Sequence, residues 1–522
     1  MKQPAAQTSG LGGLLKWPLS IALALVFLYL VFKLFVAGQA IWAMGLLALA
    51  SLGFYVYLSN AAFAFRYLFP GLAGVAIFVA FPMLYTAQIG FTNYSSAHLL
   101  SEARARGYLL EQTQPDEARL MNYTLHADGK EFRLVLEGAD AGAATAAATR
   151  YISPRLALLS ANADAKIAMQ PLETTEGLGL GAPLPLAEVL KHRDVLMRLT
   201  LELPDHSVLN YAGVREFAPL KPLWKTNGDG SLKQLETGAL YRANRDSGYF
   251  EDASGEHLQP GFKVGVGFAN YARMVFDPDF RGPFLSIFVW TVAFSALTVL
   301  FTLILGMSLA VLLNWEALPY RTVYRTLLFL PYAVPSFISI LVFKGLFNQN
   351  FGEINAILDA VFGTRPAWFA DPLLAKVMLL IVNTWLGYPY IMVLCSGLLK
   401  ALPSDLYEAS AIAGASPWTN FTKITAPLII KPLTPLLISV FAYNFNNLVL
   451  ITLLTKGRPD FLNTKVPAGT SDILVSYTYR IAFQDSGQNF GLAAAISTLI
   501  FLMVAALSLA NLRLARVNQA GK

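Results

Sequence analysis

The sequence predicts an all-α polytopic membrane protein with eight transmembrane helices and a β-containing insertion domain. Of the 522 residues, 55% are hydrophobic and only 14% are charged, whereas soluble domains carry about 25% charged residues. Eight apolar windows follow one another along the chain, each long enough to cross roughly 30 Å of hydrocarbon as a helix. A long polar segment, residues 93–275, interrupts this series.

The eight windows are residues 17–36, 40–59, 67–91, 284–313, 324–346, 374–399, 430–454 and 489–512. The first window has two interpretations, because an N-terminal apolar stretch is also typical of a signal peptide. Its apolar run exceeds the roughly 7–15 residues of a signal peptide, and a second window follows almost at once. We therefore expect an uncleaved membrane anchor.

Lysine and arginine residues orient the predicted helices. They gather in the short connections on one side, such as those with Arg66, Arg325 and Lys423, and on the other side they share their loops with acidic residues. Because basic connections stay in the cytoplasm, both termini are expected there and the insertion outside. The predicted parts are 1–92 with three transmembrane helices, 93–275 with the insertion, and 276–522 with five helices.

The insertion is predicted to be a small domain with β-structure. Residues 122–138 alternate in polarity around Asp128–Gly129, a dipeptide typical of hairpin turns. Residues 195–214 form a second predicted strand pair, which turns at Pro204–Asp205. The stretch 139–190 is rich in alanine, glycine and proline and shows no clear pattern. We expect this domain to dock a soluble partner.

The chain offers few groups for a cofactor or for catalysis. All five histidines lie in the insertion, and no two of them have the spacing of metal ligands. No GxxxxGK[ST] phosphate loop occurs anywhere in the sequence. We therefore expect no catalytic residues, no metal and no cofactor in this chain, so that any ATP hydrolysis takes place on another one.

The predicted cytoplasmic connection between the sixth and seventh windows contains helix start and stop signals. Ser404 is expected to cap a first helix, and Gly414 fits the left-handed position that ends one. Ser416 followed by Pro417 starts a second helix, which Pro427 is expected to end. The pattern predicts two helices joined by a glycine elbow. One interpretation of such a hairpin is an amphipathic segment on the bilayer surface.

The same connection resembles a loop of a known family. Its stretch EASAIAGASPWTNFTKITAP is similar to the pattern E-A-A-x3-G-x9-I-x-L-P of binding-protein-dependent ABC importer permeases. The matching residues are Glu408, Ala409, Gly414, Ile424 and Pro427. Ser410 and Ala426 depart from the pattern, and both are small. The resemblance implies a type I ABC importer permease fold in which this loop couples the protein to a cytoplasmic ATPase.

The resemblance extends over the second half of the chain. The stretches NTWLGYPYIM, FNFNN, VPAGTSDILVSYTYRIAF and NFGLAAAISTLIF are similar to permeases of maltose/maltodextrin importers. That family implies a transporter subunit of the bacterial inner membrane that works by alternating access and is not itself an enzyme. It also implies a second permease subunit, two ATPase subunits that bind ATP and Mg, and a periplasmic maltose-binding protein held by the insertion.

Three amide side chains, Asn444, Asn446 and Asn447, lie in the otherwise apolar seventh window. On one continuous helix, Tyr443, Asn444 and Asn447 share a face, whereas Asn446 points away from it. Amides in membrane helices often hold neighbouring helices together, and we expect that role for Asn446. For Asn444 and Asn447 the aromatic neighbour on the same face favours contact with a substrate.

The sixth window carries a matching stripe, in which Asn383, Leu386, Gly387 and Tyr390 are spaced i, i+3, i+4 and i+7. Two such stripes around one cavity would offer amides for sugar hydroxyls, aromatic rings for the apolar face of a sugar, and a gap at the glycine. The resemblance implies that these positions form an intramembrane sugar site. The predicted substrate-binding residues are Asn383, Leu386, Gly387, Tyr390, Tyr443, Asn444 and Asn447.

Two alternatives remain open from the sequence. A permease of the same class could carry another oligosaccharide. A membrane enzyme could use the insertion as its catalytic domain, but the insertion contains many acidic residues without a recognisable catalytic pair. Neighbouring reading frames for a second permease, an ATPase and a secreted binding protein would discriminate the transporter from the enzyme.

Overall fold

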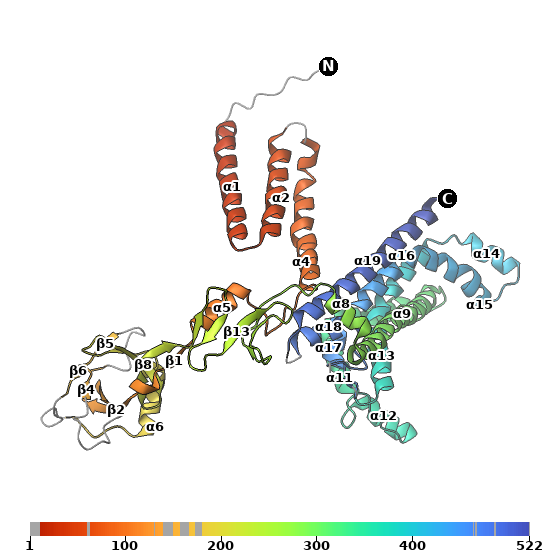
Figure 1. The fold of residues 1–522 in the computed structure, drawn as a ribbon. Coiled ribbons are helices and arrows are strands. Elements are labelled where there is room, and N and C mark those ends of the chain that lie inside the picture. The colour runs from red at the N-terminus through yellow and green to blue at the C-terminus, as the bar shows by residue number, and fades with distance from the viewer. Residues whose placement is uncertain are drawn as a thin grey trace. The chain divides into compact units, whose positions relative to one another are not determined.

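The computed structural model describes residues 11–59, 63–129, 131–138, 150–156, 166–172, 180–462, 464, 467–484 and 487–520. The chain divides into two compact units (Figure 1). The helical unit comprises Met1–Thr92 and Gly267–Lys522, and the insertion unit comprises Asn93–Val266. The insertion had been predicted to extend to residue 275, but residues 269–276 form a helix of the helical unit.

The N-terminal part of the helical unit contains α1 (Leu11–Val36), α2 (Ala40–Leu58) and a third span built from α3 (Phe69–Val75) and α4 (Phe81–Ile89). A π-helical turn, Ala76–Ala80, joins α3 to α4, and the Phe81 N–H bonds to the carbonyl of Ala76, five residues back. Pro82 follows directly. A proline inside a helix lacks an N–H and crowds the carbonyl four residues earlier, so the wider turn lets the span continue through it.

The C-terminal part holds the remaining long helices, which are α9 (Pro278–Asn314), α13 (Pro372–Lys400), α16 (Ala426–Phe445) and α19 (Phe490–Ala520). Shorter helices connect them: α8 (Ala269–Phe276), α10 (Arg321–Ala333), α11 (Ser336–Leu346), α12 (Glu353–Phe362), α14 (Asp405–Ile412), α15 (Pro417–Asn420), α17 (Leu448–Leu454) and α18 (Leu474–Phe483). Within the described residues, seven helical stretches are long and apolar enough to span a membrane, and one bent pair brings the number to at most eight.

The fifth window, predicted as one helix over 324–346, is the bent pair. The axes of α10 and α11 differ by 93°, and Val334 between them has an extended backbone. The cause is Pro335, because a residue that precedes a proline is driven out of the helical conformation.

The seventh window was also predicted as a continuous helix, over 430–454, and this is wrong. The helix begins earlier, at Pro417, and ends at Phe445. Asn447 then caps the separate helix α17 by accepting a hydrogen bond from the Leu450 N–H at 3.3 Å. Asparagine side chains compete with the helical backbone for its hydrogen bonds, so the amides of this stretch end one helix and begin the next.

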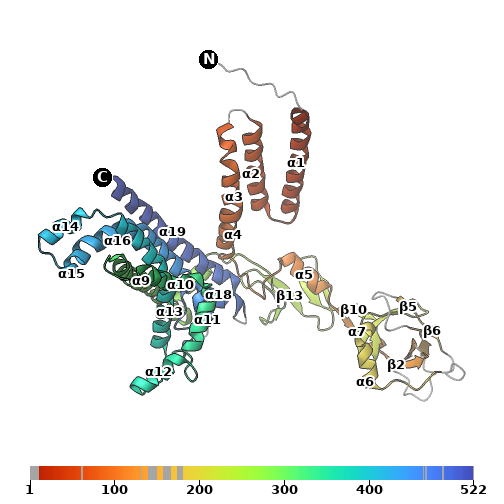
Figure 2. The ribbon, with the colours of Figure 1, turned by 180° about the vertical axis from the view of Figure 1, so that it is seen from behind.

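Helices α9 and α13 pack along much of their length and lie side by side in both views (Figure 2). Small residues permit this close approach. A Cβ atom on Gly387 would lie 2.8 Å from Cγ2 of Thr302, and one on Gly306 would lie 2.9 Å from the Ile391 side chain. This pair is the framework on which Asn383 is placed.

In the described residues of the insertion unit, the strands form three antiparallel or mixed sheets. An eight-stranded sheet has the order β5-β7-β8-β9-β2-β3-β4-β6, a five-stranded sheet has the order β11-β12-β13-β14-β15, and β1 pairs with β10. The strands are β1 (Thr113–Pro115), β2 (Met121–Asp128), β3 (Glu131–Gly138), β4 (Arg150–Ile152), β5 (Lys166–Ala168), β6 (Gln170–Pro171), β7 (Thr200–Glu202), β8 (Val208–Gly213), β9 (Glu216–Ala218), β10 (Leu220–Pro222), β11 (Trp224–Thr226), β12 (Leu232–Gln234), β13 (Leu240–Asn244), β14 (Tyr249–Glu251) and β15 (His257–Leu258). The unit also has the helices α5 (Glu102–Leu110), α6 (Leu186–Val189) and α7 (Arg193–Leu196).

Both strand pairs predicted in the insertion are present. Strands β2 and β3 form the first hairpin, and Gly129 in its turn has a φ of +71°. Strands β7 and β8 form the second, antiparallel pair. Much of the stretch 139–190, for which no pattern was found, lies outside the described residues, and the described part adds the short strands β4, β5 and β6.

Candidate substrate-binding site

A cavity of about 810 Å³ lies within the helical unit, lined by residues of α9, α11, α13, α16 and α17 and of the bend between α10 and α11. All seven predicted substrate-binding residues line it: Asn383, Leu386, Gly387, Tyr390, Tyr443, Asn444 and Asn447. Helix periodicity on the sixth window and the asparagines of the seventh therefore led to one place in the fold. That these residues bind a sugar stays a prediction.

The sequence analysis missed other lining residues. Thr298 and Thr302 on α9 face the cavity, as does the segment 331–336 around the bend. Hydroxyl residues recur along one stripe of α9, at Thr291, Ser295, Thr298 and Thr302, and all four are buried. This spacing of four and three residues was the signal in the sequence that could have identified the α9 wall.

The amide cluster, by which we mean Asn383, Asn444 and Asn447, is bonded to itself. Nδ2 of Asn383 donates to Oδ1 of Asn444 at 2.7 Å and to the Thr298 hydroxyl at 3.1 Å. Nδ2 of Asn447 donates to Oδ1 of Asn383 at 3.4 Å, and Nδ2 of Asn444 donates to the Val440 carbonyl at 2.8 Å. The side chains of the cluster thus satisfy one another without a ligand.

The remaining predicted residues differ in what they present to the cavity. Asn383 and Asn444 are only 5% and 4% exposed, whereas Tyr443 is 72% exposed. The aromatic surface is therefore accessible in this conformation and the amides are closed off. The Thr302 side chain packs against Gly387, so this glycine permits the close packing of α9 and α13 at the wall of the cavity.

Two expectations about the seventh window need correction. Tyr443, Asn444 and Asn447 do not share one helical face, because α16 ends at Phe445 and Asn447 belongs to the start of α17. Asn446 does not tie α16 to a neighbour. Its side chain is exposed, and its amide donates to the Ala442 carbonyl of its own helix at 3.3 Å.

The predicted coupling loop contains the expected elbow. Gly414 has a φ of +71°, and the Ser416 hydroxyl accepts the Thr419 N–H at 3.2 Å as a cap. Ser404 precedes α14 but makes no capping bond to the backbone. Pro427 does not end the second helix, because a π-helical turn over 421–425 carries the chain through it, as in the third span.

Side-chain bonds join the two arms of this loop. Ser410, one of the two departures from the family pattern, is buried and donates to Asn420 across the elbow, and the hydroxyls of Tyr407 and Thr425 lie 3.0 Å apart. Ala409 and Glu408 are exposed, while Ile424 is half-buried. Ile412 is 90% exposed. The loop is therefore braced internally and leaves an apolar side chain uncovered.

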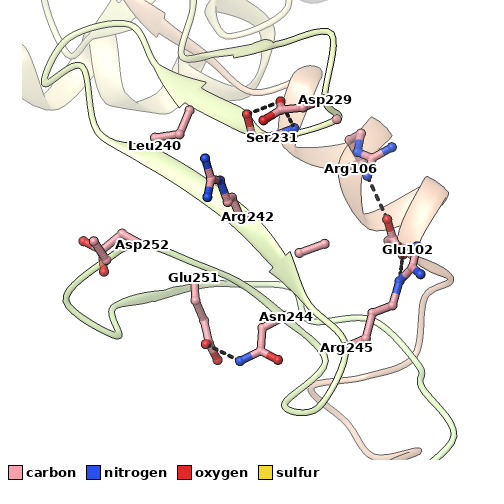
Figure 3. Close-up of a pocket in the computed structure, with 13 residues that line it drawn as sticks. Glu102, Arg106, Asp229, Ser231, Leu240, Arg242, Asn244, Arg245, Glu251 and Asp252 are labelled. Atoms are coloured by element: carbon pink, nitrogen blue, oxygen red, sulfur yellow. Dashed lines mark hydrogen bonds and ion pairs between the residues drawn. The ribbon is translucent and has the colours of Figure 1, made fainter.

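A second cavity, of about 890 Å³, lies in the insertion unit and is lined by charged residues of α5, β13 and the turns nearby (Figure 3). Glu102 accepts from Arg106 at 2.8 Å and from Arg245 at 3.2 Å. Hydrogen bonds from Ser231 lower the pKa of Asp229, and those from Ser247 and Asn244 lower the pKa of Glu251. The carboxylates of this cavity are thus already satisfied by the protein.

Metal binding finds no support in the part of the chain that the structure describes, where no three His, Cys, Asp or Glu side chains gather into a possible site. Two of the five histidines, His98 and His257, lie against the ring of Tyr249, with centroid distances of 4.4 Å and 4.5 Å. His98 is held by the Ser95 hydroxyl at 2.9 Å, and burial lowers the pKa of its imidazole.

Comparison with known proteins defines the class of protein to which this chain belongs. Residues 302–518 match the family model for the inner membrane component of binding-protein-dependent transport systems, and residues 100–267 match the model for the P2 domain of the maltose transport system permease protein MalF. The chain is thus a transporter permease subunit and not an enzyme, and it belongs to a multi-pass inner membrane protein family whose members require a partner ATPase and a substrate-binding protein.

Proteins of similar sequence show which family of transporter permeases this chain belongs to. The maltose/maltodextrin transport system permease protein MalF of Salmonella typhimurium is 48% identical over 511 residues, and MalF of Escherichia coli K12 is 47% identical, with 97% of each chain covered in both cases. The chain belongs to the MalF family. A solved structure, a bacterial alginate ABC transporter in complex with an alginate pentasaccharide-bound periplasmic protein, aligns at 21% identity and a TM-score of 0.41 over 48% of this chain and 83% of its own.

Proposed function

We propose that this chain carries maltose and maltodextrins through the inner membrane by alternating access. The observation that supports this most is the cavity, which gathers three tyrosines and three amides without a charged side chain in a member of the MalF family. A neutral sugar offers hydroxyls to amides and C–H faces to aromatic rings. A site without charge suits such a substrate.

The self-bonded amide cluster suggests how sugar enters. Each hydroxyl that replaces an amide partner exchanges one hydrogen bond for another, and a typical exchange changes the free energy by only about 0.5–1.5 kcal/mol. The exposed ring of Tyr443 can receive the sugar first, and the amides then exchange their mutual bonds for bonds to it. When the sugar leaves, the amides bond to one another again.

The partners in this proposal are a second permease subunit similar to MalG, two ATPase subunits similar to MalK, and a periplasmic maltose-binding protein. The ATPase subunits bind ATP and Mg, and this chain binds no cofactor. The braced coupling loop has Glu408 and Ala409 on its first helix, Gly414 at its elbow, and Ile424 and Pro427 beyond the elbow. It seats against an ATPase subunit through exposed side chains such as Ile412. Both termini lie in the cytoplasm, and the insertion lies in the periplasm against the binding protein.

Uptake into proteoliposomes that contain all four kinds of subunit tests the proposal, with a panel of glucose oligomers as substrates. Asn444→Ala leaves Nδ2 of Asn383 without its 2.7 Å acceptor and is expected to lower maltose uptake about 5- to 100-fold, the range of one unsatisfied buried polar group. Asn446→Ala is the matched control, because this neighbouring amide is exposed and bonds only within its own helix. Uptake at the wild-type rate in Asn444→Ala would place the sugar site elsewhere.

A further inference from the structure

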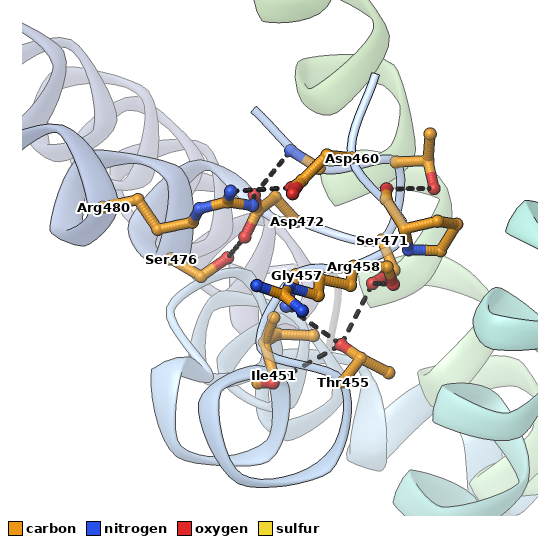
Figure 4. A network of polar contacts seen from close by, with 12 residues as sticks. Ile451, Thr455, Gly457, Arg458, Asp460, Ser471, Asp472, Ser476 and Arg480 are labelled. Carbon is orange, nitrogen blue, oxygen red and sulfur yellow. Dashed lines mark hydrogen bonds and ion pairs between the residues drawn. The ribbon is translucent and has the colours of Figure 1, made fainter. Parts of the chain in front are cut away.

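The segment 455–473, between α17 and α18, is held by a buried ion pair (Figure 4). Asp472 is 0% exposed, and its carboxylate accepts from Nη1 of Arg480 at 2.8 Å, from the Ser476 hydroxyl at 2.8 Å and from the Gly469 N–H at 2.9 Å. Nη2 of Arg480 also binds Asp460 at 2.7 Å. The two ends of the segment are thereby fastened to one guanidinium group on α18.

Two glycines allow this arrangement. Gly457 has a φ of +79°, and a Cβ atom there would overlap the carboxylate of Asp472. A Cβ atom on Gly469 would overlap the carbonyl oxygen of Gly457. The backbone at Gly457 and Gly469 therefore packs directly against the buried charge.

The network, which we call the Arg480 network, is attached to α17 through Thr455. The Thr455 hydroxyl accepts from the Ser471 hydroxyl at 3.0 Å and from the Gly457 N–H at 3.2 Å. Ser471 also donates to the Arg458 carbonyl at 2.6 Å. These bonds fix the end of α17 that lies away from the cavity.

The opposite end of α17 is part of the amide cluster. Asn447 caps α17 and donates to Asn383 across the cavity wall. Between the two ends, Leu450, Ile451 and Leu454 are fully buried in one apolar core with Ile473. A helix of two turns packed in this way moves as one body, so its position at Thr455 determines its position at Asn447.

We infer that Asp472 and Arg480 are positioning residues for the sugar site, which they act on through α17. This inference rests on the proposed function. A buried ion pair is a poor means of gaining stability, because apolar residues of similar size often stabilise as well, whereas its directional bonds fix a geometry. The hydrogen bonds described for the pair go to Asp460, Gly469 and Ser476, none of which lines the cavity.

Two measurements on the assembled transporter test the inference. Hydrogen exchange reports the position of α17, and residues 448–454 are expected to exchange faster in Arg480→Lys than in the wild type. Thr455→Val serves as a second variant, because it keeps the ion pair and removes only the hydroxyl that joins it to α17. Arg365→Lys is the matched control, since Arg365 pairs with Asp359 at 2.8 Å on the exposed surface.

Uptake of a short and a long maltodextrin reports the effect on the site. In Arg480→Lys and Thr455→Val the ratio of the two uptake rates is expected to change by about two- to thirty-fold, the range for residues that act through a packed network. The ratio in Asn447→Ala should change in the same direction, and adding Arg480→Lys to Asn447→Ala should change it no further. A merely structural role would lower both rates alike and leave the ratio as it was.

Unchanged exchange in 448–454 would overturn the inference whatever the substrate is, and so would a double variant whose ratio is the product of the two single effects. Failure of the wild type to take up any maltodextrin would instead overturn the proposed function. In that case the exchange measurement still decides whether the ion pair positions α17.

Discussion

The helical unit contains two buried polar networks that differ in charge. The amide cluster is neutral, and its members bond to one another at 2.7–3.4 Å. The Arg480 network is built on an ion pair whose carboxylate is fully buried. Neutral amides can exchange partners at little cost, whereas an ion left unpaired in a buried place costs several kcal/mol. In the proposed function, the groups that release the sugar would thus be exchangeable, and those inferred to hold a position would not.

The largest expected effect lies in the charged network. Asp472→Ala removes one of the two carboxylates that pair with the Arg480 guanidinium and leaves the Gly469 N–H without its acceptor, and the free energy of unfolding should fall by up to about 3–5 kcal/mol. Denaturant titration of the purified protein measures this loss. Asp359→Ala breaks an exposed pair and should cost no more than about 1 kcal/mol. Equal losses in the two variants would contradict the contrast between the networks.

The amide cluster should respond less strongly. Asn383→Ala removes the central amide and leaves Oδ1 of Asn444 and Nδ2 of Asn447 without their partners. The expected loss of stability is about 1–3 kcal/mol, and maltodextrin uptake should fall while ATP hydrolysis continues. The same titration, together with uptake, checks this. A loss as large as that of Asp472→Ala would show that the neutral cluster is no more exchangeable than the ion pair.

The coupling loop extends the comparison to a backbone position. Gly414 has a φ of +71° and open space around it, so Gly414→Ala is opposed only by the backbone, at about 1–2 kcal/mol. We expect the substitution to shift the elbow and to uncouple ATP hydrolysis from uptake. Gly414→Asp should uncouple the two activities more completely than Gly414→Ala. Gly397→Ala on α13, also in open space and at an ordinary φ, is the control. If ATP hydrolysis stays coupled to uptake in Gly414→Asp, the loop does not transmit the coupling.

The smallest effect is expected in the insertion unit, where the ion pairs are exposed. The hydrogen bond from Arg155, supported by Arg133, lowers the pKa of Asp128. A carboxyl group whose folded pKa is below its unfolded value of about 3.9 contributes stability above that pH and loses it as the pH falls through the folded value. The stability of the unit should therefore decrease as the pH is lowered below about 3.9. In Asp128→Asn the stability should depend less on pH in this range. The same acid transition in Asp128→Asn and in the wild type would contradict a stabilising role for the ionised Asp128 side chain.

Sequence reasoning located the apolar spans and the cavity residues because both depend on local pattern. Twenty apolar residues must cross a membrane as a helix, and stripes such as Asn383 to Tyr390 hold on any regular helix. The two broken spans escaped because the same apolar composition suits one helix or two. Only the exit from helical geometry at Val334 and at Asn447 distinguishes them.

The Arg480 network could not be predicted, because its residues are brought together by the folding of a segment that reads as an ordinary outer loop. Asp460, Asp472 and Arg480 look like solvated loop charges in the sequence, and only their tertiary contacts reveal that Asp472 and Arg480 are buried, whereas Asp460 is exposed. One signal was available: Arg480 lies within the otherwise uncharged stretch LVSYTYRIAF of α18. A lone arginine among buried aromatic and aliphatic residues requires a partner.

The mutual bonding of Asn383, Asn444 and Asn447 bears on a hazard that every solute importer faces, the leakage of protons and ions between substrates. Water can form a continuous chain through a membrane protein where polar groups lack hydrogen-bond partners. In this structure these amides bond to one another, and two of them, Asn383 and Asn444, are nearly buried. In the proposed function, the groups that admit a polyhydroxyl solute would therefore also insulate the membrane whenever that solute is absent.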